Sequence, residues 1–213
     1  MDEGSAGGVR LEFASGRPAV VEWDQINELL HPIGFGLWPL DLGAAPSAVQ
    51  ELLARPTLST AEAASVEKHF LLSRERLVEI IIESGRTPQV PDGGELSTFD
   101  STNGVTYPQL FVIGAGVDYT RFDHFHVNAT RDGEGLDEVL QVLSGGGIKV
   151  RQHLTDDGEF TVTIGCPAPD AGWILTYDGG RPHIGSFTDA QPGTKVLVQA
   201  IGPPQWGVTY VDV

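Results

Sequence analysis

Two histidines separated by one residue, His124 and His126, are the side chains in this sequence best placed for chemistry. They fall in a run from Phe122 to Asn128 that is typical of a β-strand. Because side chains alternate across a strand, both imidazoles are expected to leave the same face. Each neutral imidazole offers a nitrogen lone pair, so the pair predicts a metal site. The alternative is an ordinary half-buried histidine bonded to a nearby carbonyl, beside an Asp123 that faces solvent.

A carboxylate follows on the next predicted strand. Glu138 shares a face with the apolar residues Leu140 and Val142. An unpaired charge on an apolar face is costly to bury, so Glu138 needs a partner there, and a metal ion would supply one. The alternative is that Glu138 is a solvated residue at the strand end and that Glu134, in the preceding loop, is the ligand.

This pattern resembles the first motif of the cupin family, which has a glycine, a His-x-His pair, a glutamate and a further glycine. His124, His126, Glu138 and Gly145 match it. The departure is the gap of eleven residues between His126 and Glu138, which is longer than the family's usual gap. The segment from Asn128 to Leu136 is therefore predicted to be an extended hairpin loop, an insertion that need not move the strands.

The second cupin motif is matched in its spacing. Counting from Gly172, the positions of its proline, glycine, histidine and asparagine are held by Asp178, Gly180, His183 and Phe187. The turn glycine and the histidine are kept, while the proline and the asparagine are lost. The alternative for His183 is that it only caps the turn after Arg181 and Pro182.

The resemblance implies an antiparallel β-barrel of the jelly-roll type that holds one divalent metal through His124, His126, Glu138 and His183. It also implies that Glu138 acts in catalysis, as the anionic ligand that offsets the metal's charge or takes a proton. Fe(II) is the leading metal, with Mn(II), Ni(II) or Zn(II) as alternatives. The implied activity is that of an oxidoreductase, a dioxygenase-type oxidation of a small organic molecule. Two alternatives remain: a redox-neutral isomerase, lyase or cyclase, and a non-catalytic ligand-sensing cupin with a helical partner-binding domain.

The secondary-structure elements predicted along the chain, which must position these residues, indicate an α+β fold in two parts. Residues 1–100 are expected to be mainly helical with a short β arm, the first eight residues being disordered, and residues 105–213 to form the β-barrel. Helices are predicted over residues 24–30 and 46–55, from Thr60 after a capping box of Ser59 and Glu62, and from Ser73 to Gly85. The helices and the loop at residues 128–136 are expected to shield the barrel mouth from water. Candidate pocket walls are the aromatic residues Tyr107, Trp173, Tyr177 and Trp206.

The composition indicates which partners and which cellular compartment to expect. The net charge of −16 disfavours nucleic acid as a partner. A single cysteine, Cys166, excludes an internal disulfide, and with no leader-like start and no long apolar run the chain is expected to be soluble and cytoplasmic. The stretch from Leu58 to Pro88 faintly resembles the end of a helix-turn-helix unit, but its charges are balanced. A homodimer contact is a further possibility for these helices.

Overall fold

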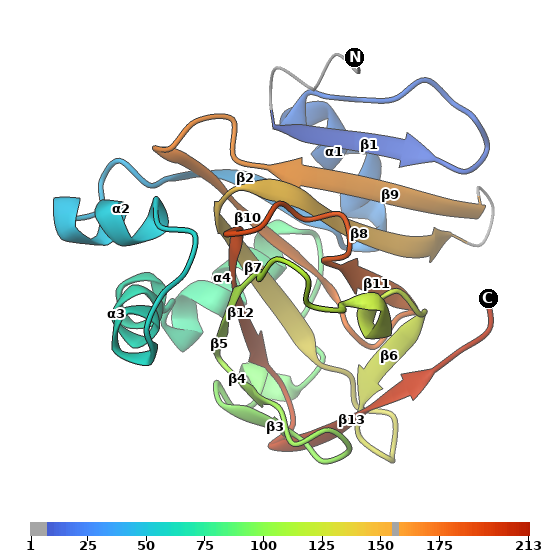
Figure 1. The fold of residues 1–213 in the computed structure, drawn as a ribbon. Coiled ribbons are helices and arrows are strands. Elements are labelled where there is room, and N and C mark those ends of the chain that lie inside the picture. The colour runs from blue at the N-terminus through green and yellow to red at the C-terminus, as the bar shows by residue number, and fades with distance from the viewer. Residues whose placement is uncertain (1–7, 155–157) are drawn as a thin grey trace.

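Two facing β-sheets form most of the computed structural model, which describes residues 8–154 and 158–213 (Figure 1). The disorder expected at the N-terminus falls on residues 1–7, outside the described part. The first sheet has eight strands in the order β1 (Val9–Phe13), β9 (Gly158–Gly165), β8 (Gly146–Leu154), β11 (His183–Ser186), β6 (His126–Ala129), β13 (Gln205–Tyr210), β3 (Thr98–Asp100) and β4 (Thr106–Tyr107). The second has five strands in the order β2 (Gly36–Asp41), β10 (Ala171–Asp178), β7 (Asp137–Ser144), β12 (Lys195–Ile201) and β5 (Gln109–Val112). Neighbouring strands run antiparallel except β13 and β3.

The main hydrophobic core lies between the two sheets. Strand β7 contributes Leu140 and Val142, while β8 and β9 contribute Val150 and Val162, all of them fully or almost fully buried. This is the face that the alternation in the sequence predicts for Glu138 and its apolar neighbours, so that prediction is confirmed. Residues on the same side of β7 as Leu140 therefore point into the space between the sheets.

Strands from the N-terminal region extend both sheets. Strand β1 pairs with β9, and β2 pairs with β10. The sheets thus take strands from both sides of the boundary expected near residue 100. Strand β2 was not foreseen from the sequence because it contains Pro39, which cannot donate to a ladder hydrogen bond. An edge strand tolerates proline, and β2 lies at the edge of its sheet.

Four α-helices are present among the described residues, close to their predicted bounds: α1 (Trp23–Leu30), α2 (Ser47–Leu53), α3 (Thr60–Phe70) and α4 (Arg74–Glu83). The capping box of Ser59 and Glu62 is formed at the start of α3. Beyond α4, Gly85 has a φ of 84°, the left-handed conformation that favours glycine after a helix.

Helices α2, α3 and α4 pack on the outer face of the five-stranded sheet. Val66 and Phe70 of α3 contact Leu143 and Leu197, and the buried isoleucines of α4 contact Val139, Ile174 and Ile201. This face is the one turned away from the first sheet. The prediction that these helices shield the interior is therefore wrong, because their apolar stripes are used to cover the opposite side.

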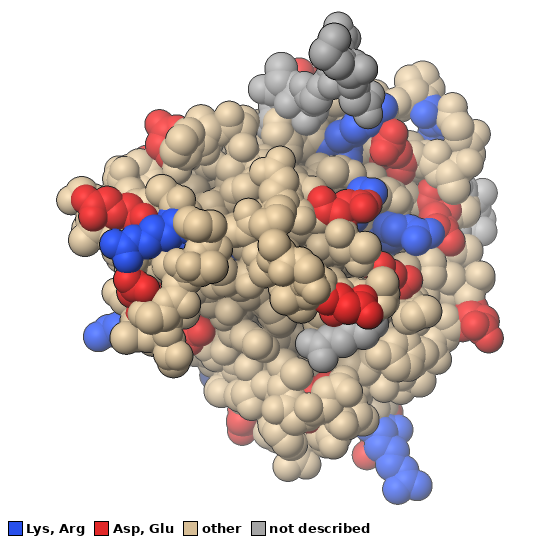
Figure 2. Space-filling model, viewed as in Figure 1, with Lys and Arg blue, Asp and Glu red and all other residues tan. Residues whose placement is uncertain are grey.

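Charged side chains of both signs are interspersed on the face shown in Figure 2, without a broad patch of either sign. Ion pairs near the surface include the exposed pair of Lys149 with Asp189 and the half-buried pair of Arg151 with Glu159. Of the described helices, none has the length and apolar character needed to cross a membrane.

Candidate functional site

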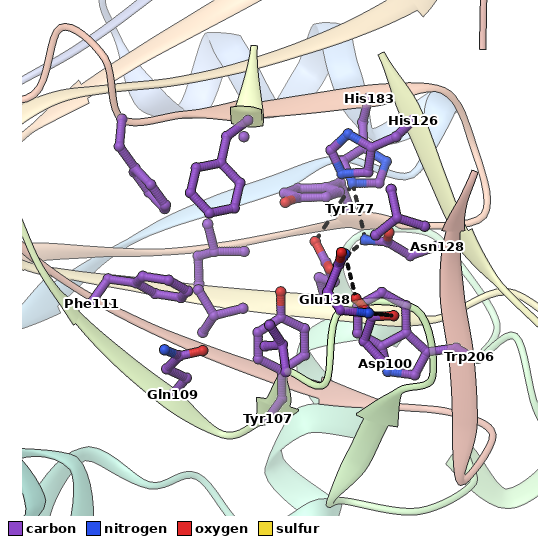
Figure 3. A pocket seen from close by; sticks show the side chains of 18 of the residues that line it. Asp100, Tyr107, Gln109, Phe111, His126, Asn128, Glu138, Tyr177, His183 and Trp206 are labelled. Atoms are coloured by element: carbon purple, nitrogen blue, oxygen red, sulfur yellow. Dashed lines mark hydrogen bonds and ion pairs between the residues drawn. The ribbon is translucent and has the colours of Figure 1, made fainter. Parts of the chain in front are cut away.

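A cavity of about 140 Å³ lies between the sheets, with a polar end and an apolar end (Figure 3). The polar end is lined by side chains that can donate, accept or coordinate: Asp100, Tyr107, His126, Asn128, Glu138, Tyr177 and His183. The apolar end is lined by Phe111, Phe122, Leu140, Phe187 and Val198. The strands β6, β7, β10 and β11 supply most of the polar residues, so the positions of these side chains are fixed by the ladders.

His126 and His183 are brought together by strand pairing. Their Cα atoms are partners in the β6–β11 ladder, and their ring centroids lie 4.4 Å apart. Each Nδ1 atom lies 2.8 Å from a backbone carbonyl, that of His124 for His126 and that of Arg181 for His183. A carbonyl can only accept, so each Nδ1 carries the proton and each Nε2 keeps its lone pair. Anchoring of this kind is typical of metal-binding histidines.

His183 is a neutral imidazole. Its side chain is buried, and burial together with the neighbouring His126 lowers its pKa to about 3. Its Nε2 atom is 3.8 Å from Oε2 of Glu138. Because the imidazole is uncharged above that pKa, this contact is not an ion pair.

Glu138 is a buried carboxyl group without a lysine or arginine partner in the described part of the chain. Burial raises its pKa, against hydrogen bonds from Tyr177 and Asn128 and the electrostatic effect of the nearby His126. The Asn128 amide donates to Oε1 at 2.8 Å. Glu134, the alternative ligand, is exposed in the loop before β7. The structure thus brings Glu138, and not Glu134, beside the two imidazoles.

The structure places His124 outside this cavity. Its side chain is exposed and lines a separate surface hollow with Tyr210 and Val211. Strand β6 begins only at His126, so the alternation assumed for the two histidines does not extend back to His124. What His124 contributes to the site is its backbone carbonyl.

Asn128 takes the place expected for a second histidine on this strand. It lies two residues beyond His126 on β6, and its side chain is 2% exposed. Its Nδ2 atom contacts both Glu138 and, at 3.4 Å, Nε2 of His183. The signal for Asn128 was present in the sequence as a polar residue two positions from a histidine on a predicted strand, but an amide is a less conspicuous ligand.

Two phenols complete the polar end, the half-buried Tyr107 and the buried Tyr177. Burial, reinforced by the charge of Glu138, raises the pKa values of Tyr107 and Tyr177 well above 10, so both keep their protons. Tyr107 stacks on Trp206 at 5.7 Å between ring centroids. Three of the four predicted wall residues line the cavity; Trp173 instead lies in the main core.

A turn that the sequence did not single out also lines the cavity, through Asp100 and Asn103. The Asp100 carboxylate accepts hydrogen bonds from the backbone and side chains of Thr102 and Asn103. Burial would raise the pKa of Asp100, but these hydrogen bonds outweigh it and hold the pKa below its ordinary value. Of the loop predicted over residues 128–136 to shield the interior, only Asn128 lines the cavity, and it does so from strand β6.

Comparison with known proteins gives a match at the level of structure alone. No family model matches the chain, and no curated protein matches it. A solved acireductone dioxygenase from Bacillus anthracis, with a cadmium ion in its active centre, superposes with a TM-score of 0.58. The match covers 92% of this chain and 93% of that one at 12% sequence identity. The shared fold is the cupin fold. The fold implied by the sequence motifs is thereby supported.

The donor atoms of this cupin-fold cavity suit a divalent metal in kind. Two imidazole nitrogens and a carboxylate are the donors that Fe(II), Mn(II) and Zn(II) accept. A buried carboxyl that pairs with no lysine or arginine of the described residues, and an Asn128 Oδ1 without a hydrogen-bond partner there, are groups that a cation would satisfy. Among the described residues, however, no group of three His, Cys, Asp or Glu side chains could hold a metal ion as they lie. His126, His183 and Glu138 would therefore have to move closer together to share one ion.

Proposed function

We propose that this chain is a metal-dependent enzyme of the cupin fold that oxidises a small organic molecule with dioxygen. His126, His183 and Glu138 are the proposed protein ligands of one divalent metal, with Fe(II) the first choice. The observation that carries the proposal is that two imidazoles with unprotonated Nε2 atoms and a buried carboxylate line the polar end of one cavity (Figure 3). Two histidines and one carboxylate are the ligand set of many non-haem iron oxygenases.

When bound, such a metal supplies Lewis acidity and one-electron chemistry toward dioxygen. The chain's own residues provide the rest of the site. The carbonyls of His124 and Arg181 hold the two imidazoles in the tautomer with a free Nε2. Glu138 supplies the negative charge that offsets the cation.

The two phenols can position an oxygen atom of the substrate. Tyr107 and Tyr177 both line the cavity and remain protonated. The Tyr107 hydroxyl can donate to a carbonyl or enolate oxygen, while the Tyr177 hydroxyl, which donates to Glu138, can accept a hydrogen bond from a substrate hydroxyl. At the other end of the cavity, Phe111, Phe122 and Phe187 form an aromatic cluster with ring centroids 5.3–6.3 Å apart. This cluster suits an apolar substituent and excludes water from the reacting end.

The first substrate class to test is suggested by the structural neighbour, whose name specifies an acireductone. The experiment measures metal content of the purified protein and dioxygen uptake after anaerobic Fe(II) loading, with an acireductone and other small enediols. We expect a stoichiometric metal in the wild type, its loss in Glu138→Gln and His183→Gln, and its retention in His124→Ala. A wild type that takes up no transition metal after loading would overturn the proposal.

A redox-neutral reaction is the second candidate. The observation that favours it is the juxtaposition of Glu138 with Tyr177, a carboxyl with a raised pKa beside a phenol, which can pass a proton between two substrate atoms. Conversion of an enediol or hydroxyketone without consumption of dioxygen, retained under strictly anaerobic conditions, would select this reaction over oxidation.

A further inference from the structure

One side of the cavity carries a buried negative charge. Asp100, on β3, lines the cavity and is only 1% exposed. Hydrogen bonds from Thr102 and Asn103 hold its pKa below the ordinary value, so the carboxylate is ionised at neutral pH. All of these donors are uncharged, and no lysine or arginine of the described residues contributes to the shift of its pKa. A buried charge without a counter-ion is costly, which points to a cation supplied from outside the chain.

Two aromatic rings lie beside this carboxylate. Asp100 and Trp206 are partners in the β3–β13 ladder, so their side chains are neighbours on one face of the sheet. Trp206 in turn stacks on Tyr107, with ring centroids 5.7 Å apart (Figure 3). The face of an indole or phenol ring attracts a cation through the negative charge of its π-system. A carboxylate beside such rings therefore suits an organic ammonium ion.

The strand on the other side of Trp206 adds an unsatisfied acceptor. Asn128, on β6 next to β13, lines the cavity and is 2% exposed, and its Oδ1 atom accepts no hydrogen bond from the described residues. An ammonium group has only donors, so it can satisfy an oxygen of this kind. Among the described residues that line the cavity, the one buried donor without a partner is Nε1 of Trp206. A neutral oxygen on the same ligand, such as a hydroxyl, would accept from it.

The charges around the cavity and its approach favour the same class of ligand. Of the described residues that line the cavity, Asp100 and Glu138 are acids and none is a lysine or arginine. Tyr210 lines both the cavity and the surface hollow beside it. That hollow adds Asp123 and Asp212, again without a lysine or arginine among its described residues. Acids along an approach raise the local concentration of cations and repel anions.

We propose that the cavity binds a small amine, with its ammonium group at Asp100, Tyr107 and Trp206 and its apolar substituent at the opposite, apolar end. The role of this amine as the substrate rests on the function proposed above, whereas its binding does not require a metal. Anions of the same size, such as carboxylates and phosphate esters, are disfavoured by the same charges. The inference thus narrows the substrate class from small organic molecules to small organic cations.

The test is calorimetric titration of phenethylamine, phenethyl alcohol and phenylacetate into the full-length protein, freed of metal by a chelator. These ligands share a ring and differ in charge at neutral pH. We expect the amine to bind about tenfold or more tightly than the alcohol, because a charge-assisted hydrogen bond replaces a neutral one, and the acid to bind most weakly. Asp100→Asn should weaken amine binding about tenfold and leave alcohol binding unchanged. Asp189→Asn, which removes the same charge at an exposed position outside the cavity, is the matched control and should bind the amine as the wild type does.

The outcomes separate this inference from the proposed function. Equal affinities for the amine and the alcohol, tighter binding of the acid, or no binding of the amine overturns the inference, and these comparisons on the wild type need no variant to fold. Amine binding that Asp100→Asn does not weaken overturns the placement of the ammonium group. Because the protein is metal-free in the titration, a failure to take up metal or consume dioxygen would overturn the proposed function and leave amine binding standing.

Discussion

Adjacent acids on strand β7 have opposite surroundings. Asp137 points to the outer face of the five-stranded sheet, where it pairs with Arg86 and accepts a hydrogen bond from the Gln89 backbone at 2.7 Å. Glu138 points inward, where the Asn128 amide and the Tyr177 hydroxyl are its hydrogen-bond donors among the described residues. Burial raises the pKa of both, but in Asp137 the Arg86 charge opposes it.

The same contrast holds for the two faces as a whole. On the outer face, buried polar side chains are paired with the helical segments: Gln141 donates to the Phe70 carbonyl, and the Lys195 ammonium donates to the Leu53 and Arg55 carbonyls. These polar groups attach helices to the sheet. On the inner face the pairing is incomplete, which is costly for folding alone and useful for binding an ion or a ligand.

The largest expected effect is on the outer face. Asp137→Ala would leave the buried Arg86 guanidinium without its carboxylate, with the Ser84 and Thr176 hydroxyls as its remaining acceptors among the described residues. Removing one partner of a buried ion pair costs about 3–5 kcal/mol. Urea denaturation should show this loss. Asp189→Ala, which breaks the exposed pair with Lys149, should cost no more than about 1 kcal/mol. Equal losses of stability in the two variants would contradict the expected difference between a buried and an exposed ion pair.

The next effect concerns acid stability of the metal-free protein. The folded-state pKa of His183 is lowered to about 3 from 6.5, so between these values the unfolded chain binds more protons than the folded one. Stability contributed by the neutral imidazole is therefore present above about pH 6.5 and is lost as the pH falls toward 3, by about 1.4 kcal/mol per pH unit. Denaturation from pH 7 to pH 5 should show a steeper loss in the wild type than in His183→Gln. Parallel profiles would show that His183 is not buried as a neutral group.

A smaller loss of stability is expected when the Lys195 ammonium on the outer face of the five-stranded sheet is removed. Lys195 is fully buried, and burial lowers its pKa to about 8. Lys195→Met would leave the carbonyls of Leu53, Arg55 and Gly193 without this donor, at a cost of about 2 kcal/mol. Thermal or urea denaturation at pH 7 gives the measurement. Lys68→Met, an exposed position on α3, is the control and should stay within about 0.5 kcal/mol of the wild type.

The smallest effect on stability is expected for Glu138, the acid on the inner face of the five-stranded sheet. Glu138→Gln keeps the shape of the side chain and removes a carboxylate whose charged form is already disfavoured by burial. In the presence of a chelator we expect a stability change below about 1 kcal/mol, in either direction. A loss as large as that of Asp137→Ala would mean that Glu138 is a structural residue, and the proposed role of the inner face would fail.

Local sequence patterns determined much of this protein. The alternation of Glu138 with Leu140 and Val142 predicted which side chains face the interior, and the capping residues Ser59 and Ser73 located two helix starts. Such features depend on neighbours a few residues away, so the chain encodes them directly. The spacing that singled out His183 selected a residue that lines the cavity.

The tertiary structure determined which residues form the candidate site. His126 meets His183, and Asn128 meets Glu138, only because β6 begins at His126 and pairs with β11 in one register. The sequence could not show that the strand starts two residues after His124, and a shift of that size exchanges His124 for Asn128 in the cavity. The same limit applies to β1 and β2, whose partners lie more than a hundred residues away along the chain. Pairings of that kind depend on how the whole sheet closes on its core, which no local pattern records.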